Sequence, residues 1–512
     1  MAKTKIKKVT TSKKKSFIEV LKSFFIANKT ESILLIFVTL LSLVLRLYRI
    51  DEYLTFLGDE GRDVRIVRDL ITKGNLVFIG PQTSVGNMYL GPLYYYLLAP
   101  ALFLSGLNPV GPAIANALIG TLTVLLTWFA GRAWFGKVAG FVSAFFLAIS
   151  PVAIIYSRSS WNPNPAPLFA LICAYSIYQV WQNQKPKWIV VTAISLAAAL
   201  QMHYLCLLLI PFLGLFWFLS LRSQNKLQKS ALLRSSALGF LIFLLIMSPL
   251  VLFDLKHEGM NFKAFKSFFT DRQTTINLNP AKSDRFLPVL ETINTDLYLA
   301  RQDLDSVWPL IIFICLVFFA LVANKNKSAT YLTVIWIAIA VLGLGVYKQH
   351  VYIHYLGFIY PAVFLLLGLI ISLGVTHKSA IVKFLSLSLF VYLTFLNAKF
   401  SPLWQQPNRQ MQITENAVDL IIKESDGKPF NFGLIAKQNY DESYRYFFEN
   451  KKAKMIRGEA GVTDQLFVIC EDGDKCQPEG NPAYQIAIFG PAKVIKTWQI
   501  NHLKIYLLKK TP

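Results

Sequence analysis

Residues 32–48 read SILLIFVTLLSLVLRLY, an apolar run that decides how the rest of the chain is interpreted. A helix rises about 1.5 Å per residue, so roughly 20 mostly apolar residues cross the hydrocarbon core of a bilayer. The run is long enough for this, and we predict that it is the first transmembrane helix. Residues 1–31 before it are rich in Lys and Ser. This basic segment should stay in the cytoplasm while the helix acts as a signal anchor.

An acidic cluster follows about ten residues after this run, where residues 58–63 read GDEGRD. The spacing puts ionisable side chains at a membrane surface. Carboxylates in that place suggest catalysis. A structural alternative is that Asp59 only caps a helix, because an Asp accepts hydrogen bonds from the free backbone N–H groups of a first turn. We expect Asp63 and Asp69 to be solvated or salt-bridged.

The composition also indicates a membrane protein, since 54% of the 512 residues are hydrophobic, 14% are aromatic and only 16% are charged. A soluble enzyme rarely has this composition. The formal net charge of +23 would fit a nucleic-acid partner, but the Lys and Arg residues lie between apolar segments and do not form one basic patch. We therefore expect contact with membrane lipids and none with nucleic acid.

Apolar segments recur along the chain, and we predict about eleven crossings of the cell membrane by helices. Basic loops alternate with less basic ones, and the basic loops should face the cytoplasm. The other side then holds a first outer loop (49–109) and a large outer loop (254–304), which we expect to cover the active site. The predicted crossings are 33–48, 110–130, 137–156, 164–182, 187–203, 204–220, 232–253, 305–323, 329–347, 354–374 and 379–398.

The apolar segment 89–104 is ambiguous. Counting it as a crossing would put the Lys-rich loops outside, so we predict that it lies flat at the outer interface. Tyr94, Tyr95 and Tyr96 support this position, since Tyr rings settle at the level of the lipid headgroups. A second interfacial helix should begin near Asp59, because the apolar residues that follow recur at helical spacing.

Residues 401–512 are more polar and contain short strand-like runs, including 465–469 and 484–489. We predict a small extracytoplasmic α/β domain here, after a transmembrane domain that spans residues 32–400. Cys470 and Cys476 lie close together in a predicted outer domain, so a disulfide is plausible, with two free thiols as the alternative. The sequence leaves open whether this domain recognises a substrate, regulates access or stabilises the fold.

Further polar residues fall at predicted outer turns. Arg158 lies in an outer loop with few other basic residues, and it is a candidate for stabilising an anionic leaving group. The alternative is an Arg that extends to the headgroups. The candidates at the other two turns are His203, Tyr204, Lys348, His350, His354 and Tyr355. A single His at such a turn can equally be an ordinary hydrogen-bonded residue of the interface.

The order and placement of these motifs resemble the GT-C superfamily of membrane glycosyltransferases, and most of all the protein O-mannosyltransferases and the aminoarabinose transferases of lipid A. The likeness covers roughly residues 30–400. It implies an α-helical polytopic fold of GT-C type, with about eleven transmembrane helices and interfacial helices in the first outer loop. The residues that carry the resemblance are Asp59-Glu60 after the first helix, Ser157-Arg158 after the third crossing, and His354-Tyr355 shortly before Tyr360-Pro361.

The resemblance implies an enzyme of the cell envelope that moves a sugar, a hexose or a modified pentose, from a polyprenyl-phosphate donor. The acceptor would be a lipid, a glycan or a protein at the outer face of the cytoplasmic membrane. Asp59 would act as general base in an inverting displacement, and Glu60 would position substrate. The substrate-binding residues would be Arg158, His203, Tyr204, Lys348, His354 and Tyr355, with Lys348 the first candidate for the donor phosphate.

Two asparagines bear on the need for a metal. Relatives often carry an Asp shortly after the Ser-Arg motif, where this chain has Asn162 and Asn164. An amide oxygen does not supply the charge that holds a divalent cation well. We therefore expect no metal site and no required cofactor, and a bound divalent cation is doubtful.

A transporter, such as a flippase of lipid-linked saccharides, is the main alternative function. It should carry charged residues within its helices and show two related halves. The apolar segments are mostly free of ionisable residues, and the polar candidates gather on one side of the membrane. This pattern favours an enzyme.

Overall fold

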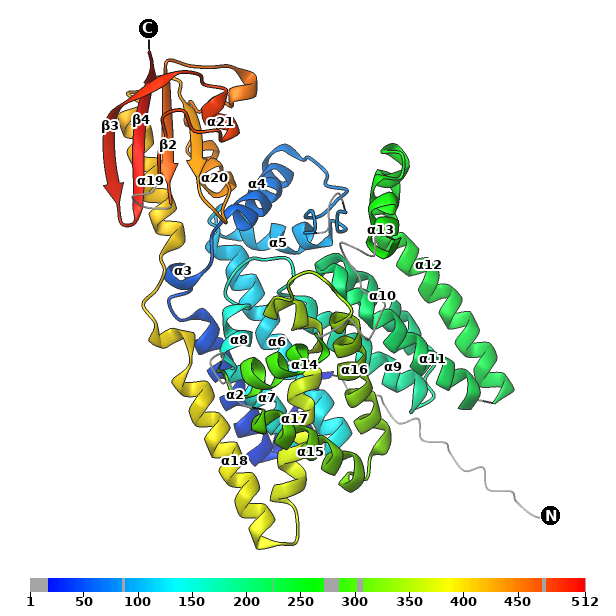
Figure 1. Cartoon of the computed structure of the whole chain (residues 1–512). Helices are drawn as coiled ribbons and strands as arrows, with labels where there is room; N and C mark the ends of the chain where they lie inside the picture. The colour runs from blue at the N-terminus through cyan, green and yellow to red at the C-terminus, as the bar shows by residue number, and fades with distance from the viewer. Residues whose placement is uncertain are drawn as a thin grey trace, which may run out of the picture.

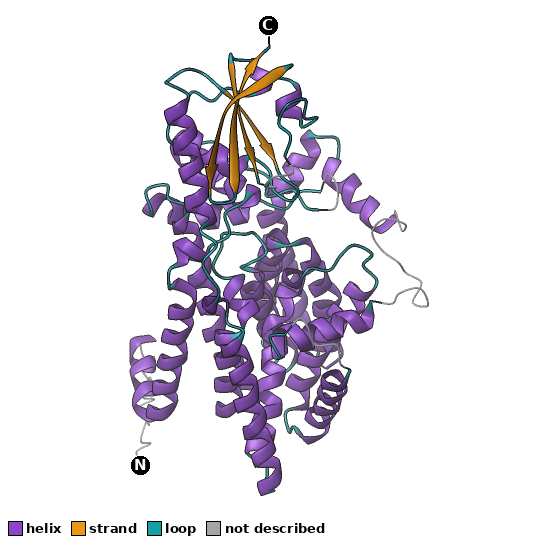
Figure 2. Cartoon of the chain, turned by 60° about the vertical axis from the view of Figure 1, so that its left-hand side comes forward, coloured by secondary structure: helices purple, strands orange, loops and turns teal. Residues whose placement is uncertain are grey.

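The computed structural model describes residues 17–84, 88–223, 225–270, 285–301, 307–471 and 476–511. Helices make up the larger part, and a small sheet domain that ends in the C-terminus lies at one end of the helical part (Figures 1 and 2). The predicted architecture of a mostly helical chain with several membrane-spanning helices and a small C-terminal α/β domain is confirmed. The large outer loop is described only in part, because residues 271–284 and 302–304 lie outside the described ranges.

Every predicted crossing coincides with a helix. Seven described helices are long and apolar enough to cross a membrane by length and composition, and five further apolar helices are shorter. The exact number of crossings stays a prediction. The helices at the predicted crossings are α2 (Lys29–Leu47), α6 (Val110–Phe135), α7 (Lys137–Ile149), α9 (Ala166–Trp181), α10 (Trp188–Met202), α11 (Leu209–Ser223), α12 (Lys226–Lys256), α15 (Trp308–Ala323), α16 (Lys327–Gly345), α17 (Tyr360–Val375) and α18 (Ala380–Lys399).

Burial separates the central helices from the peripheral ones. Almost every side chain of α17 is buried, as expected for a helix that is apolar all round and packs on neighbours on every side. In contrast, α12 buries only Leu232 and Gly239. An apolar helix that exposes most of its side chains fits a position against lipid. Figure 1 shows α12 and α13 (Met260–Thr270) at the edge of the helical part.

One transmembrane helix contains a buried charge that the sequence did not bring out. Arg46 of α2 is 1% exposed and donates hydrogen bonds to the backbone oxygens of Leu147 (3.1 Å) and Ala148 (2.9 Å). The last carbonyls of a helix have no partner within it. Since α7 ends at Ile149, Arg46 satisfies carbonyls that burial would otherwise leave without hydrogen bonds. This is a structural use of the charge.

The first outer loop contains α3 (Ile50–Tyr53), α4 (Gly58–Lys73) and α5 (Leu93–Leu104). The helix that we predicted near Asp59 is α4, and the ambiguous apolar segment is α5. These two helices pack together above the transmembrane part (Figure 1). The expectation that the Tyr rings of α5 lie at the headgroups is wrong for Tyr94 and Tyr95, which are fully buried in protein contacts, while Tyr96 is 39% exposed.

The remaining short elements connect these helices. They are α1 (Phe17–Ala27), α8 (Pro151–Ile155), α14 (Phe286–Thr292), the 3₁₀ segments η1 (Tyr204–Leu208), η4 (Ile353–Ile359), η5 (Pro402–Trp404) and η6 (Gly458–Ala460), and the π-helical turn η3 (Ile293–Tyr298). The segment η5 leads from α18 into the C-terminal domain. Tyr53 of α3 donates a hydrogen bond to the backbone oxygen of Gln405 (2.8 Å), which fixes that connection against the first outer loop.

The C-terminal domain is built on a four-stranded sheet with strand order β1-β2-β4-β3. The strands β1 and β2 are parallel, and the other two pairs are antiparallel. Helices α19 and α20 pack against each other beside the sheet. The bounds are α19 (Gln410–Glu424), β1 (Asn431–Ile435), α20 (Glu442–Asn450), β2 (Gln465–Cys470), α21 (Tyr484–Ala487), β3 (Ala492–Ile500) and β4 (Leu503–Lys510).

Two local predictions for this domain have opposite outcomes. The predicted strand at 465–469 is β2, but the strand-like run 484–489 forms the short helix α21 (Tyr484–Ala487) and the turn after it. Ile486 of the helix and Phe489 of the turn are both buried. Cys470 and Cys476 are joined in a disulfide.

Candidate active site

Helix α4 presents the acidic motif through its first turn. The helix begins at Gly58, after Leu57 as N-cap, and the backbone N–H of Leu57 donates to Oε2 of Glu60 (3.0 Å). This is the second half of a capping box, in which the third residue of the helix bonds back to the N-cap. Glu60 therefore caps the helix, and the alternative that Asp59 is the N-cap is wrong. A role of Glu60 in positioning substrate stays a prediction.

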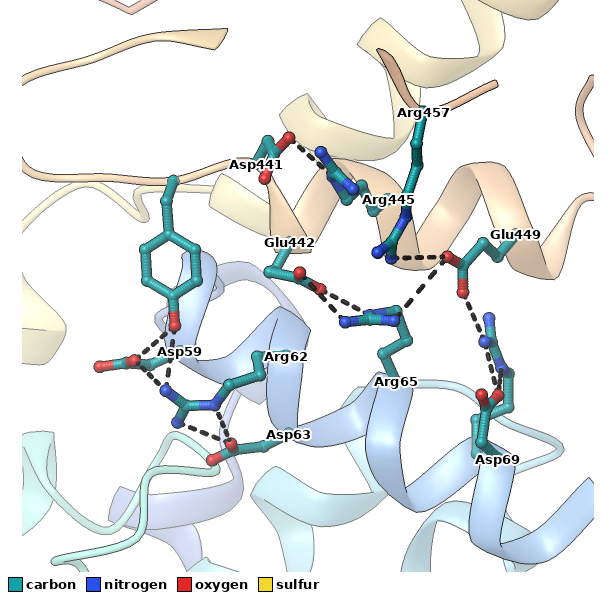
Figure 3. A network of polar contacts seen from close by, with 12 residues as sticks. Asp59, Arg62, Asp63, Arg65, Asp69, Asp441, Glu442, Arg445, Glu449 and Arg457 are labelled. Atoms are coloured by element: carbon teal, nitrogen blue, oxygen red, sulfur yellow. Dashed lines mark hydrogen bonds and ion pairs between the residues drawn. The ribbon is translucent and has the colours of Figure 1, made fainter. Parts of the chain in front are cut away.

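Asp59 has one oxygen held and one oxygen open. Its Oδ1 accepts hydrogen bonds from Nη1 of Arg62 (2.8 Å) and from the hydroxyl of Tyr440 (2.6 Å), as Figure 3 shows for the arginine. Its Oδ2 has no hydrogen-bond partner among the described residues. The side chain is 40% exposed. A carboxylate fixed at one oxygen and open at the other can accept a proton from a group that reaches it from solvent or from the membrane surface.

Asp63 lies one turn along the helix and is fully buried. Its Oδ1 accepts hydrogen bonds from Arg62 (2.7 Å) and from the hydroxyl of Tyr95 (3.3 Å). Arg62 thus joins the carboxylates of Asp59 and Asp63 (Figure 3). The prediction that Asp63 is salt-bridged is confirmed, but it is not solvated, because α5 covers it. Asp69 is also salt-bridged, to Arg68 and Lys73.

Burial changes the proton affinity of both acids beside Asp59. Desolvation disfavours a charged carboxylate. It raises the pKa of Glu60 from its ordinary value to about 8. It also raises the pKa of Asp63 to about 7, against the opposing effect of the Arg62 charge. Asp59 is therefore the solvent-accessible acid of this turn, and its two acidic neighbours are enclosed.

Arg158 is occupied by the end of a helix. Its two terminal nitrogens donate to the backbone oxygens of Leu45 (2.8 Å) and Tyr48 (2.6 Å), at the last turn of α2. The guanidinium lies 4.9 Å from the ring centre of Tyr53 and the residue is 3% exposed. The alternative of an Arg that extends freely to the headgroups is wrong. Binding of an anionic leaving group by Arg158 stays a prediction.

The predicted histidine and tyrosine candidates converge in one aromatic cluster. The ring centres of His203 and Tyr355 are 4.9 Å apart, and those of His203 and His354 are 6.1 Å apart. Tyr204 packs on His203 at 4.6 Å. The segments η1 and η4, which are far apart in sequence, bring these four residues together. The sequence indicated their convergence but not their stacking.

Three members of this aromatic cluster were not predicted. The hydroxyl of Tyr347 lies 2.8 Å from that of Tyr204. Oγ of Ser84, in the first outer loop, lies 3.4 Å from the hydroxyls of Tyr204 and Tyr355. The ring of Trp161 lies 4.3 Å from His354. Tyr347 and Trp161 adjoin predicted candidates in sequence, so their aromatic character was an available signal, whereas Ser84 gave none.

A cavity of about 840 Å³ lies beside this cluster. It is lined by three segments, 288–296, 307–310 and 350–353, which contribute aliphatic side chains together with Asp296, Trp308, His350 and Tyr352. Burial raises the pKa of Asp296 to about 6. The rings of Tyr352 and His354 stack at 5.5 Å, which joins the cavity to the aromatic cluster. A contact of Lys348 with a phosphate stays a prediction.

The two asparagines turn their amide nitrogens toward backbone oxygens. Nδ2 of Asn162 donates to Met202 (2.7 Å), and Nδ2 of Asn164 donates to Ser159 (2.8 Å). These bonds hold the loop after Arg158 in place. Within the described ranges, no group of three His, Cys, Asp or Glu side chains is arranged to hold a metal ion. Whether the reaction needs a metal stays a prediction.

The comparisons with known proteins agree with this architecture. Residues 90–253 match the family model of dolichyl-phosphate-mannose-protein mannosyltransferases. The structure of ArnT from Cupriavidus metallidurans bound to undecaprenyl phosphate is similar over 94% of this chain and 98% of that chain, with 13% sequence identity and a TM-score of 0.62. The chain has the GT-C fold. The expected resemblance to GT-C glycosyltransferases and the predicted enzyme class are confirmed.

A second solved structure of this fold is more distant. The archaeal oligosaccharyltransferase AglB from Archaeoglobus fulgidus, in complex with an inhibitory peptide and a dolichol-phosphate, is 13% identical. The similarity covers 86% of this chain and 69% of that chain, with a TM-score of 0.52. No curated protein sequence matches the chain. The family match includes Arg158, His203 and Tyr204, whereas Asp59 lies before its first residue.

Proposed function

We propose that this GT-C protein transfers a sugar from a polyprenyl-phosphate donor to an acceptor at the outer face of the cytoplasmic membrane, with inversion and with Asp59 as general base. The geometry of Asp59 carries the proposal. Its Oδ1 is fixed by Arg62 and Tyr440, its Oδ2 is open, and its helix follows the first transmembrane helix by a short connection. A base in this place can act on an acceptor while the donor lipid remains in the bilayer.

The reaction follows from this arrangement. The acceptor hydroxyl or amine gives its proton to Oδ2 of Asp59 and attacks the anomeric carbon of the donor. The bond from that carbon to the phosphate oxygen breaks, and its electron pair leaves with the polyprenyl phosphate. Direct displacement inverts the anomeric centre. Proton transfer by a positioned side chain contributes typically about 10²–10⁴-fold to a rate.

The aromatic cluster and the adjoining cavity are the proposed binding region for the donor headgroup. Flat aromatic faces and carboxylates are suited to a sugar ring, and Trp308, Tyr352 and Asp296 offer both at the cavity wall. The polyprenyl-phosphate class is supported by the undecaprenyl phosphate bound to ArnT and the dolichol-phosphate bound to AglB. A hexose or modified pentose, and a lipid, glycan or protein acceptor, are the proposed substrates.

We also propose that this site works without a metal or another cofactor. The two asparagines after Arg158 support this, since the amide nitrogens of Asn162 and Asn164 both donate hydrogen bonds to backbone oxygens. The basic loops support a cytoplasmic N-terminus and an extracytoplasmic C-terminal domain. Turnover that is unchanged after dialysis against a chelator would support metal independence, and a C-terminal tag accessible only from outside would support the orientation.

The decisive experiment compares the purified wild type with Asp59→Asn on a set of polyprenyl-phosphate sugars, with consumption of the lipid donor as the readout. We expect the wild type to consume at least one donor and the variant to lose about 10²–10⁴-fold in turnover. An unchanged turnover in the variant would contradict the assignment of the base. Movement of a lipid-linked saccharide across proteoliposomes, with no donor consumed, would favour a flippase.

A further inference from the structure

The C-terminal domain reaches the proposed base directly. Tyr440 lies in the connection from β1 to α20, and its hydroxyl donates to Oδ1 of Asp59 (2.6 Å). Nη1 of Arg62 donates in turn to the Tyr440 hydroxyl (3.1 Å). Asp59, Arg62 and Tyr440 therefore form a closed triangle of hydrogen bonds. Two of its corners belong to α4, and the third comes from a residue 381 positions later in the chain.

The start of α4 is shaped to accept this ring. A Cβ atom on Gly58 would lie 2.5 Å from two ring atoms of Tyr440. Real Cβ contacts are never that short, so the absence of a side chain at position 58 lets the ring lie against the helix. The backbone N–H of Gly58 also donates to Oδ1 of Asn439 (2.8 Å). The connection is thus bonded to α4 through both residues.

The connection from β1 to α20 is also fixed by hydrogen bonds within the C-terminal domain. Nδ2 of Asn439 and the hydroxyl of Tyr444 both donate to Oε1 of Glu471, at 2.8 Å each. Glu471 follows Cys470, the end of β2 and one half of the disulfide. The side chain of Asn439 is thus bonded to Gly58 of α4 and to Glu471 of its own domain. Because its neighbour Asn439 is already ordered, Tyr440 loses less conformational entropy when it binds Asp59.

Helix α20 fixes the domain along the rest of α4. Arg65 pairs with Glu442 (2.5 Å), as Figure 3 shows, and Arg68 pairs with Glu449 (2.6 Å). A Cβ atom on Gly61 would lie 2.3 Å from backbone atoms of Ser443, so the two helices touch at a glycine. The contact between the domains is close and charged, and it sets the position of Tyr440.

We propose that Tyr440 is a positioning residue for Asp59, and that the C-terminal domain thereby completes the active site. This inference rests on the proposed role of Asp59 as general base. The Tyr440 hydroxyl and Arg62 hold Oδ1, which prevents rotation of the carboxylate and directs Oδ2 to the acceptor. The charged and titratable groups around Asp59 are Glu60, Arg62 and Asp63 of its own helix and Tyr440 of the opposite domain.

The test compares Tyr440→Phe with Tyr446→Phe in the full-length protein, using the donor that the wild type consumes. Tyr446 is a matched control, since its hydroxyl also joins the two domains, by a hydrogen bond to the backbone oxygen of Leu107, but it does not contact Asp59. We expect Tyr440→Phe to lower kcat about tenfold with little change in KM, because the carboxylate of Asp59 loses one of the two groups that orient it.

The control variant should keep the kcat and KM of the wild type. A kcat in Tyr440→Phe equal to that of the wild type would overturn the inference, and so would an equal loss in both variants. Gly58→Ala gives a second route, because its Cβ displaces the ring without removing the hydroxyl, and it should reproduce the loss in kcat. If Asp59→Asn retains full turnover, the proposed function fails. If Asp59→Asn is inactive and Tyr440→Phe is normal, only the role of Tyr440 fails.

Discussion

The two ends of α4 lie under the same domain and use their charges differently. At the N-terminal end, Asp59 meets one cation and one hydroxyl, and one of its oxygens is open. At the C-terminal end, Arg68 is shared between Asp69 and Glu449, and Lys73 closes the group. Charges there are matched by opposite charges. The first end has the properties of a reactive site, and the second has those of a docking contact.

The difference has a physical basis in solvation. A paired surface charge contributes little to stability, typically 0–1 kcal/mol, because attraction and desolvation nearly cancel. An accessible carboxylate with an open oxygen keeps its capacity to accept a proton. Its two acidic neighbours, Glu60 and Asp63, are buried, so Asp59 is the exposed carboxylate of this end. This contrast can be tested by substitutions that affect one end and spare the other.

The largest expected effect is on catalysis at the first end. Asp59→Asn keeps the size of the side chain but removes the proton acceptor, so turnover should fall about 10²–10⁴-fold. Asp69→Asn changes the docking end in the same way, and it should change turnover by no more than a few-fold, since Arg68 keeps its pair with Glu449 and Asp69 does not contact Asp59. Donor consumption measured on both purified variants checks this. Equal losses in the two variants would remove the distinction between the ends.

The sequence predicted the part of this site that depends on local patterns. Length and apolar composition placed the crossings, and the spacing after the first one located the helix that carries Asp59. The acidic motif could not reveal Tyr440, since a contact across 381 residues leaves no local signal. Glu60 was also hard to interpret, because the usual capping pattern has Ser, Thr, Asp or Asn as N-cap, and here the N-cap is Leu57.

Arg158 shows a second limit of sequence reasoning. An arginine at an outer turn is equally suited to a phosphate and to the free carbonyls at a helix end. Only the three-dimensional arrangement shows that the last turn of α2 lies beside it and takes its hydrogen bonds. The run 484–489 failed for a related reason, because alternating and helical spacings cannot be told apart over six residues. Tertiary packing decided both cases.

The next effect concerns the contact between the first turn of α4 and the backbone of α20. Gly61→Ala places a Cβ atom 2.3 Å from the backbone of Ser443, and a backbone cannot move aside as a side chain can. We expect the domain to be displaced, with a loss of about 3 kcal/mol in the free energy of unfolding and a loss of activity. Thermal unfolding in detergent checks this. Gly214→Ala in α11 is the control, since its added Cβ meets no atom within 4 Å and should leave stability unchanged or raised.

A smaller effect depends on pH. With its pKa raised to about 8, folded Glu60 holds a proton that the unfolded chain has released above its ordinary value of 4.5. The folded state binds more protons, so raising the pH from about 5 to 8 lowers wild-type stability. Glu60→Gln keeps an oxygen for the N–H of Leu57 and carries no charge. Its stability relative to wild type should therefore rise over this window, by on the order of 3 kcal/mol. If the unfolding temperatures of wild type and Glu60→Gln differ by the same amount at every pH from 5 to 8, Glu60 does not hold a buried proton.

The smallest expected effect is at the middle of α4, where Arg65 pairs with Glu442 of α20. Arg65 meets both carboxylate oxygens of Glu442, but the two side chains are 21% and 16% exposed, so the pair is partly screened by solvent. Arg65→Gln should lower the free energy of unfolding by at most about 1 kcal/mol, and by less in high salt. Turnover should stay within a few-fold of wild type, because the Gly61 contact and the Arg68 pair still hold Tyr440 in place. A variant that unfolds normally but loses turnover as Asp59→Asn does would show that docking and catalysis are one function of α4.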